Sequence, residues 1–136
     1  IIRTNLRIPF LCMKHILPVM IRQSSGKVVS VSSRMGRIAS QMGAYAVAKG
    51  GIVTMTKTAA IQTKEYGIQV NAVAPGMIWT DMLRECNQDE VEALKKSVPL
   101  GTIGEVEDIA QCVAYLVEAK YVTGQTIGPN GGLLMP

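Results

Sequence analysis

Two side chains near the middle of the sequence are spaced for acid–base chemistry. Tyr45 and Lys49 are four residues apart in the segment YAVAK, and on an α-helix this spacing puts both side chains on one face, about one turn apart. An ammonium group close to a phenol favours the phenolate. A tyrosine in that setting can donate a proton to a substrate oxygen or accept one from it. The same pattern also fits a surface tyrosine beside a solvated lysine, so the neighbouring elements must distinguish the two.

A short β-branched segment is expected to bring a third polar group to this pair. Residues 27–33 read KVVSVSS, between a Ser-Ser-Gly turn and Gly36, which is typical of a buried strand that ends near Ser33. Ser33 stands 12 residues before Tyr45. We expect its hydroxyl to reach the same substrate oxygen as the tyrosine.

The elements around these residues predict an α/β fold. A long stretch without proline, from Ala44 to about Lys64, is apolar on more than one face and predicts a helix that is buried on two sides, such as one between a sheet and a partner subunit. Gly67 ends it, and residues 68–74 follow as a second buried strand. The order strand, helix, strand predicts a parallel sheet with helices on its faces. Ligands bind beyond the carboxyl ends of such strands, so the loops after Ser33 and from Pro75 should face one crevice.

Weaker patterns complete the chain. Helical spacing of apolar residues begins at once, over residues 5–20, and a loop is expected from Pro75 to about Cys86. A modest helix is predicted around 89–97 and a clearly amphipathic one over 105–119, with Val106, Leu116 and Val117 on its apolar stripe. Residues 125–128 are predicted to form a third short strand.

Charge is distributed unevenly along the chain. Residues 1–64 contain ten Lys or Arg and no acid, whereas residues 65–136 contain ten acids and four bases, so the two parts carry +10 and −6. A nucleic-acid surface is one interpretation. The bases are spread over several elements, however, and no aromatic residues stand between them to stack on bases. We therefore expect no nucleic-acid partner, and a small ligand that carries phosphate fits the charge as well.

Cysteine, histidine and hydropathy exclude other classes of protein. Three cysteines without a CxxC pair favour a reduced, cytoplasmic compartment. The single histidine, His15, belongs to no zinc-binding pattern, so no metal is expected. No apolar run approaches the roughly 18 residues of a membrane span, and no membrane partner is expected.

Five motifs together resemble the short-chain dehydrogenase/reductase family, in the order usual for that family. They are SSRMG at 32–36, YAVAK at 45–49, NAVAPG at 71–76, TDM at 80–82 and VTGQ at 122–125. The resemblance covers essentially the whole chain. Within the family, the segment from Pro99 to Gly132 is most similar to the subgroup of 3-oxoacyl-acyl-carrier-protein reductases and many alcohol and sugar dehydrogenases.

The resemblance implies a catalytic set of four residues. Tyr45 is then the proton donor and acceptor at the substrate oxygen, and Ser33 orients that oxygen. Lys49 tunes Tyr45 and binds the nicotinamide ribose, so Tyr45 and Lys49 also belong to the cofactor site. Asn5 resembles the family's helix asparagine, which holds a water molecule in the proton relay.

The resemblance also implies a nicotinamide cofactor, NAD or NADP. Pro75 and Gly76 correspond to the turn beneath the nicotinamide, Ile78 to a contact with the carboxamide, and Thr80 to a contact with phosphate. The implied reaction is hydride transfer between the cofactor and a carbonyl or secondary alcohol, with 3-oxoacyl reduction among the implied activities. The family also implies a homodimer or homotetramer.

One part of the family pattern is missing. The sequence contains no glycine-rich strand-to-helix turn and no Asn-Ala-Gly segment after it, and such turns hold the pyrophosphate and adenosine. We therefore expect residues 1–136 to be the carboxy-terminal part of a single, doubly wound Rossmann-like domain, with the amino-terminal phosphate-binding half absent from this chain. The alternative is a truncated, non-catalytic family member that acts as a binding or oligomerisation module.

Overall fold

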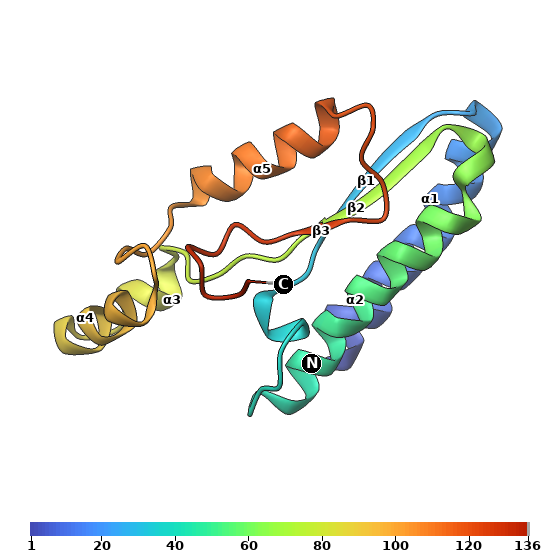
Figure 1. Cartoon of the computed structure of the whole chain (residues 1–136). Helices are drawn as coiled ribbons and strands as arrows, with labels where there is room; N and C mark the ends of the chain where they lie inside the picture. The colour runs from blue at the N-terminus through green and yellow to red at the C-terminus, as the bar shows by residue number, and fades with distance from the viewer. Residues whose placement is uncertain (136) are drawn as a thin grey trace.

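The computed structural model describes residues 1–135, except for the side chain of Met82. Its centre is a three-stranded parallel sheet in the order β1-β2-β3 (Figure 1). The strands are β1 (Gly26–Val31), β2 (Ile68–Val73) and β3 (Thr126–Ile127). Each strand is therefore joined to the next by a crossover that contains a helix, as the sequence predicts.

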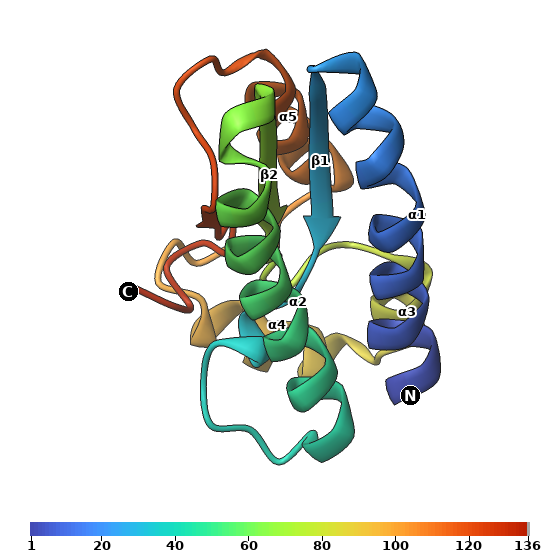
Figure 2. The same cartoon turned by 90° about the vertical axis from the view of Figure 1, so that its right-hand side faces the viewer.

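Helices cover both faces of this sheet. Figures 1 and 2 show α1 (Ile8–Gln23) and α2 (Gly43–Gln62) side by side on one face, and α5 (Val106–Glu118) on the other. The shorter α3 (Asp81–Arg84) and α4 (Gln88–Ser97) lie beyond the carboxyl ends of the strands. This arrangement confirms the predicted α/β class with a parallel, doubly wound sheet.

The core is formed mainly by β2 and the sheet-facing side of α2. Val70, Ala72 and Val73 are completely buried because β2 has a strand on each side and a helix on each face. Ala59 and Ala60 of α2 and Met13 of α1 form one apolar cluster with Val70. In contrast, the end of β1 is open, and Val31 is 53% exposed.

Local hydrogen bonds and a glycine account for how α2 ends. The hydroxyl groups of Thr56 and Thr63 donate to the carbonyl oxygens four residues earlier, which lets these polar side chains lie buried. A short 3-10 helix, η3 (Lys64–Tyr66), follows, and Gly67 then takes a left-handed conformation with φ of 64°. The chain can therefore reverse direction directly into β2.

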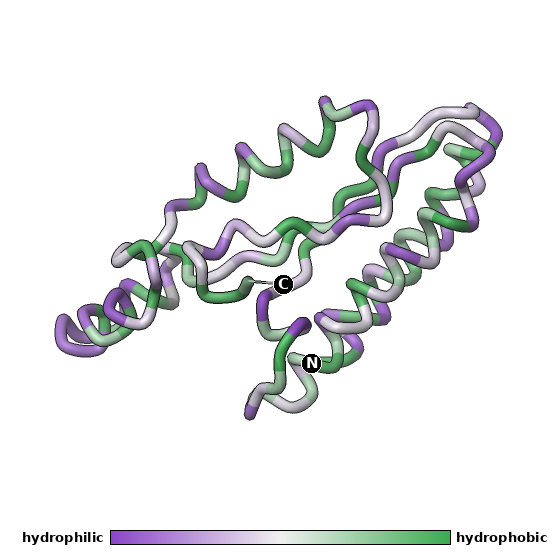
Figure 3. Tube along the Cα trace, viewed as in Figure 1, coloured by the Kyte–Doolittle hydropathy of each residue, from purple (hydrophilic) through white to green (hydrophobic). Residues whose placement is uncertain are grey.

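Several predicted details are wrong or incomplete. β1 ends at Val31, two residues before Ser33. The predicted loop over 75–86 contains α3, whose four residues are too few to give a periodic pattern. The predicted stripe of α5 is wrong at its two ends, because Val106 and Val117 are about half exposed while Leu116 is buried. Figure 3 shows apolar and polar residues alternating along α5.

The second buried side that the sequence predicts for α2 is not covered within residues 1–135. One side faces the sheet, but Val47 and Ile61 on other sides are 65% and 70% exposed. Among the described residues, no helix is long and apolar enough to cross a membrane. The same residues hold no cluster of three or more potential metal ligands.

Candidate active site

Tyr45 and Lys49 lie in the first two turns of α2, where the helix meets the end of β1. The Lys49 Nζ atom is 5.7 Å from the centre of the Tyr45 ring, within the range of a cation–π contact. The same Nζ donates a hydrogen bond of 3.0 Å to the carbonyl oxygen of Val31. Partial burial lowers the pKa of Lys49, because a charged ammonium loses hydration there.

Ser32, the residue before Ser33, holds the backbone of Lys49 in place. The buried Ser32 hydroxyl donates to the Lys49 carbonyl oxygen over 2.7 Å, and the Ser32 N–H continues the sheet by donating to Val73. Lys49 is thus held to the end of β1 through both its side chain and its backbone. The strand end that precedes Ser33 and the helical turn of Tyr45 cannot move apart without breaking these bonds.

Ser33 is the N-cap of a short 3-10 helix, η2 (Arg34–Gly36). Its Oγ accepts a hydrogen bond of 3.2 Å from the Met35 N–H. A hydroxyl that accepts in this way still has its own hydrogen to donate. Ser33 can therefore donate to a substrate oxygen bound at the corner that β1 and α2 form.

Two glycines bring η2 into direct backbone contact with α2. A Cβ atom on Gly36 would lie 2.4 Å from the Lys49 carbonyl carbon, and one on Gly50 would lie 3.1 Å from the Gly36 oxygen. No side chain larger than hydrogen fits at Gly36 unless the backbone shifts. This contact sets the spacing between the loop of Ser33 and the helix of Tyr45.

The loops after β1 and β2 meet, as the sequence predicts for one crevice. The Arg34 N–H donates to the Pro75 carbonyl oxygen over 3.2 Å. Behind this contact, the Gly76 N–H donates to Pro129, and a Cβ atom on Gly76 would lie 2.6 Å from the Cα of Asn130. The turn at Pro75 and Gly76 is therefore packed against the backbone of Pro129 and Asn130.

Asn130 is a residue of this region that the sequence interpretation missed. It is only 8% exposed, and its side chain bonds the backbone N–H groups of Gly132 and Leu134 and the Leu134 carbonyl. These bonds form the platform on which Gly76 rests. A lone asparagine in an Asn-Gly-Gly segment predicts a turn, but nothing local in the sequence indicates its contact with a loop so far back along the chain.

Ile78 and Thr80 lie farther along the same loop. Ile78 forms an isolated parallel bridge with Gly104, where Trp79 N–H donates to the Gly104 oxygen over 2.8 Å. Thr80 is exposed and precedes α3 as its N-cap. The sequence missed this support by Gly104 as well.

Asn5 lies in a turn of π-helix, η1 (Arg3–Arg7), at the start of α1. Such turns are frequent at functional sites because they displace one side chain from the regular helical face. η1 packs against α2, since a Cβ atom on Gly51 would lie 2.7 Å from the Leu6 side chain. In this structure the Asn5 amide donates to the Ile1 carbonyl oxygen over 3.2 Å.

Similarity to known proteins identifies the family. A family model described as enoyl-(acyl carrier protein) reductase matches residues 1–134. The chain belongs to the short-chain dehydrogenase/reductase family. A 3-oxoacyl-[acyl-carrier-protein] reductase of Staphylococcus epidermidis is 42% identical over 138 residues, which cover 99% of this chain and 57% of that protein. The chain therefore spans about half the length of the curated relatives that it matches.

Solved structures show the same likeness. A putative gluconate dehydrogenase from Agrobacterium tumefaciens superposes with a TM-score of 0.93 at 32% identity, over 100% of this chain and 56% of that one. The structure of ElxO with NADP bound superposes with a TM-score of 0.89 at 30% identity, over 95% of this chain and 54% of that one. The parallel sheet and its covering helices are thus those of the family.

Proposed function

We propose that this chain is the catalytic and nicotinamide-binding part of an NAD(P)-dependent oxidoreductase. On this proposal, residues 1–136 form the carboxy-terminal part of one Rossmann-like domain. The reaction is hydride transfer between the cofactor and a carbonyl or secondary alcohol. The observation that carries the proposal is the double attachment of Lys49 to the end of β1, because it holds Tyr45, Lys49 and Ser33 at one corner.

Each catalytic residue has a distinct part in the proposal. Tyr45 donates its phenolic proton to the substrate oxygen during reduction and accepts a proton during oxidation. Ser33, whose Oγ already accepts from the Met35 N–H, donates its hydroxyl hydrogen to the same oxygen. Lys49 places a positive charge beside the phenol, which stabilises the phenolate that forms. Asn5 is proposed to hold a water molecule that resupplies protons.

We propose that the loop after β2 binds the nicotinamide end of NAD or NADP. Pro75, Gly76 and Ile78 are partly exposed beside the corner, so their apolar atoms can cover a flat ring. When bound, the cofactor supplies or removes the hydride. We assign the ring to Pro75 and Gly76, the carboxamide to Ile78, the ribose hydroxyls to Tyr45 and Lys49, and a phosphate oxygen to Thr80.

A 3-oxoacyl thioester is the first substrate class to test. The support is the activity by which relatives such as the S. epidermidis protein are named, the reduction of 3-oxoacyl groups carried by acyl carrier protein. The partly exposed Met35 and Met77 on the two facing loops are compatible with an apolar substrate.

A second copy of the chain is the proposed macromolecular partner. A groove of about 880 Å³ runs between α1 and α2, and Phe10 on its rim is 53% exposed. Apolar grooves of this size between paired helices commonly bury against another subunit. Light scattering at micromolar concentration should therefore give a dimer or tetramer, and a monomer would contradict this assignment.

The proposal is tested with a chimera that joins this chain to the unmatched part of the S. epidermidis reductase. Consumption of NADH or NADPH is followed with an acetoacetyl thioester. We expect turnover, and we expect Tyr45→Phe to lower kcat by about 100-fold or more, since general acid catalysis contributes on that scale. Tyr121→Phe is the matched control, because Tyr121 is fully exposed and should leave kcat unchanged.

The alternative function is a non-catalytic binding or oligomerisation module. The observation that favours it is the open groove between α1 and α2, which is available for contact whether or not the corner is active. If the chimera binds no nicotinamide nucleotide, and if Tyr45→Phe and Tyr121→Phe behave alike in every assay, the oxidoreductase proposal fails and this alternative stands.

A further inference from the structure

A groove on the side of α2 away from α1 has no part in the proposed reaction. Its volume is about 600 Å³, within the range of small-molecule sites. One wall is α2, and the other is the segment that leads into β3, which runs beside the carboxy-terminal half of α2 in Figure 2. The lining residues that matter are Arg37, Val53, Lys57, Ile61, Lys64 and Thr126.

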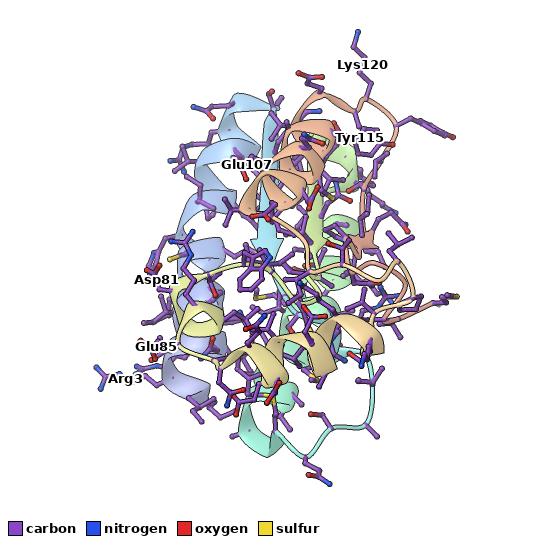
Figure 4. The ribbon with its side chains drawn as sticks, turned by 90° about the vertical axis from the view of Figure 1, so that its left-hand side faces the viewer. Arg3, Asp81, Glu85, Glu107, Tyr115 and Lys120 are labelled. Carbon is purple, nitrogen blue, oxygen red and sulfur yellow. The ribbon has the colours of Figure 1, made fainter. Side chains whose placement is uncertain are left out.

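Three cationic side chains face this groove without a compensating acid. Arg37, Lys57 and Lys64 line it, and no Asp or Glu does. Within the part of the chain that the structure describes, the ion pairs are Arg84 with Asp81 and Lys95 with Glu92. None of the three cations therefore has a carboxylate partner there. Most of the acids lie on other elements, as Figure 4 shows for Asp81 and Glu85 at the two ends of α3 and Glu107 on α5.

Arg37 is fixed at one end of the groove by Thr126. Its Nη1 donates to the Thr126 carbonyl oxygen over 3.4 Å. The Thr126 hydroxyl is covered and has no hydrogen-bond partner among the described residues. An unsatisfied covered hydroxyl is costly, and a ligand oxygen bound beside Arg37 could supply the missing acceptor after a small shift.

The charges are separated by an apolar surface. Lys57 and Lys64 are seven residues apart along α2 and η3, which is about 10 Å along a helix. Between them lies Ile61, whose side chain is 70% exposed, and Val53 adds to the same wall. A compact ion would satisfy one end of the groove and leave the isoleucine uncovered.

We propose that this groove binds an extended organic anion with an acidic group at each end and an apolar middle. One acidic group lies between Arg37 and Lys57, the other lies at Lys64, and the apolar part covers Ile61. The assignment is independent of the proposed oxidoreductase activity, because it uses none of the residues of the active-site corner.

Binding is measured by isothermal titration calorimetry of residues 1–136 at low ionic strength with three probes. Sebacate carries two carboxylates on a long alkyl chain, decanoate carries one, and succinate carries two on a short chain. We expect sebacate to bind up to about fivefold more tightly than decanoate, which lacks the second carboxylate, since each exposed ion pair contributes up to about a factor of five. Succinate is too short to cover Ile61 and should also bind more weakly than sebacate. Equal binding of sebacate and decanoate, or of sebacate and succinate, would overturn the proposal.

Two double variants locate the site. Lys57→Gln with Lys64→Gln should weaken sebacate binding about tenfold. Arg22→Gln with Lys120→Gln removes the same charge from exposed positions that line neither groove, and it should weaken binding only as far as the lower net charge weakens attraction of any anion. If both pairs weaken binding equally, sebacate binds only through net charge and the site does not exist.

The apolar contact has its own test. Ile61→Ser is an exposed substitution, so the fold should remain intact, and it should weaken sebacate binding while leaving succinate binding unchanged. An equal response of the two probes would contradict the assigned orientation along α2.

Discussion

The two loops that face the crevice are held in place by different parts of the chain. The loop after β1 is fixed mainly by the next helix along the chain, through the bond from Ser32 to Lys49 and the contact of Gly36 with Gly50, and the Arg34 N–H bond to Pro75 joins it to the second loop. The loop after β2 is fixed by residues far along the chain, through Gly104 and Asn130. The proposed acid–base residues thus depend mainly on one strand and one helix, whereas the proposed nicotinamide loop depends on segments around Gly104 and Asn130.

The largest expected effect comes from a substitution that disrupts the close backbone contact between η2 and α2. Gly36→Ala should lower the free energy of unfolding by about 3 kcal/mol, because the new methyl group meets backbone that cannot rotate away. Chemical denaturation measures this loss.

Gly50→Ala is the control on the opposite side of the same contact. Its Cβ atom would lie at 3.1 Å from a single oxygen, and alanine is favoured over glycine within a helix, so the net change should stay within about 1 kcal/mol. Equal losses for the two variants would mean that the backbone contact does not set the corner.

The next effect concerns the support of the second loop. Asn130→Ala removes a buried side chain with three hydrogen bonds to backbone and should cost about 2 kcal/mol. Asn87→Ala removes the exposed N-cap of α4, should cost about 1 kcal/mol, and should leave the second loop unchanged. Chemical denaturation measures the two losses of stability, and amide NMR spectra report whether the Gly76 signal shifts. A shift of the Gly76 signal in both variants would argue against a specific role of Asn130.

Substitutions of the adjacent serines Ser32 and Ser33 should affect stability and activity differently. Ser32→Ala loses a buried hydrogen bond to Lys49 and should cost about 1 kcal/mol, while Ser33→Ala, partly exposed, should cost less. In the chimera, Ser33→Ala should reduce kcat more than Ser32→Ala. The reverse order of activities would place the substrate contact on Ser32.

The sequence predicts the first loop better than the second for a physical reason. Strand, turn and helix from Lys27 to Lys64 follow each other directly, so propensity and periodicity reveal which side chains share an edge. Tyr45 and Lys49 needed only helical spacing to be paired. The bond from Lys49 to Val31 could not be predicted, because it joins the helix to a strand end 18 residues back along the chain.

For the second loop, the sequence predicts the location but not the support. The Pro75–Gly76 turn follows a recognisable strand, so its place at the crevice is confirmed by the contact with Arg34. Its supports, Gly104 and Asn130, lie in segments without periodicity, where distant contacts determine the conformation. The four-residue α3 is missed because so short a helix shows no periodicity either.

The smallest expected effect is the pH dependence due to Lys49. Its pKa is lowered in the folded state from the usual 10.5, so in the interval between the two values the unfolded chain binds more protons. Stability from this group must therefore rise with pH through that interval. The difference in unfolding free energy between the native chain and Lys49→Met should increase toward alkaline pH, and a difference that decreases would give the wrong sign.

Independent fixing of the two loops is tested most directly by amide hydrogen exchange in Asn130→Ala. The probes are the Gly36 N–H, bonded to Ser33, and the Gly76 N–H, bonded to Pro129, with the buried Val70 N–H as the reference for global unfolding. We expect exchange at Gly76 to accelerate about tenfold relative to Val70, which corresponds to a loss of about 1.4 kcal/mol of local stability. The exchange rate at Gly36 relative to Val70 should stay unchanged. Equal acceleration at Gly36 and Gly76 relative to Val70 would show that the loops open as one unit and would contradict their separate origin.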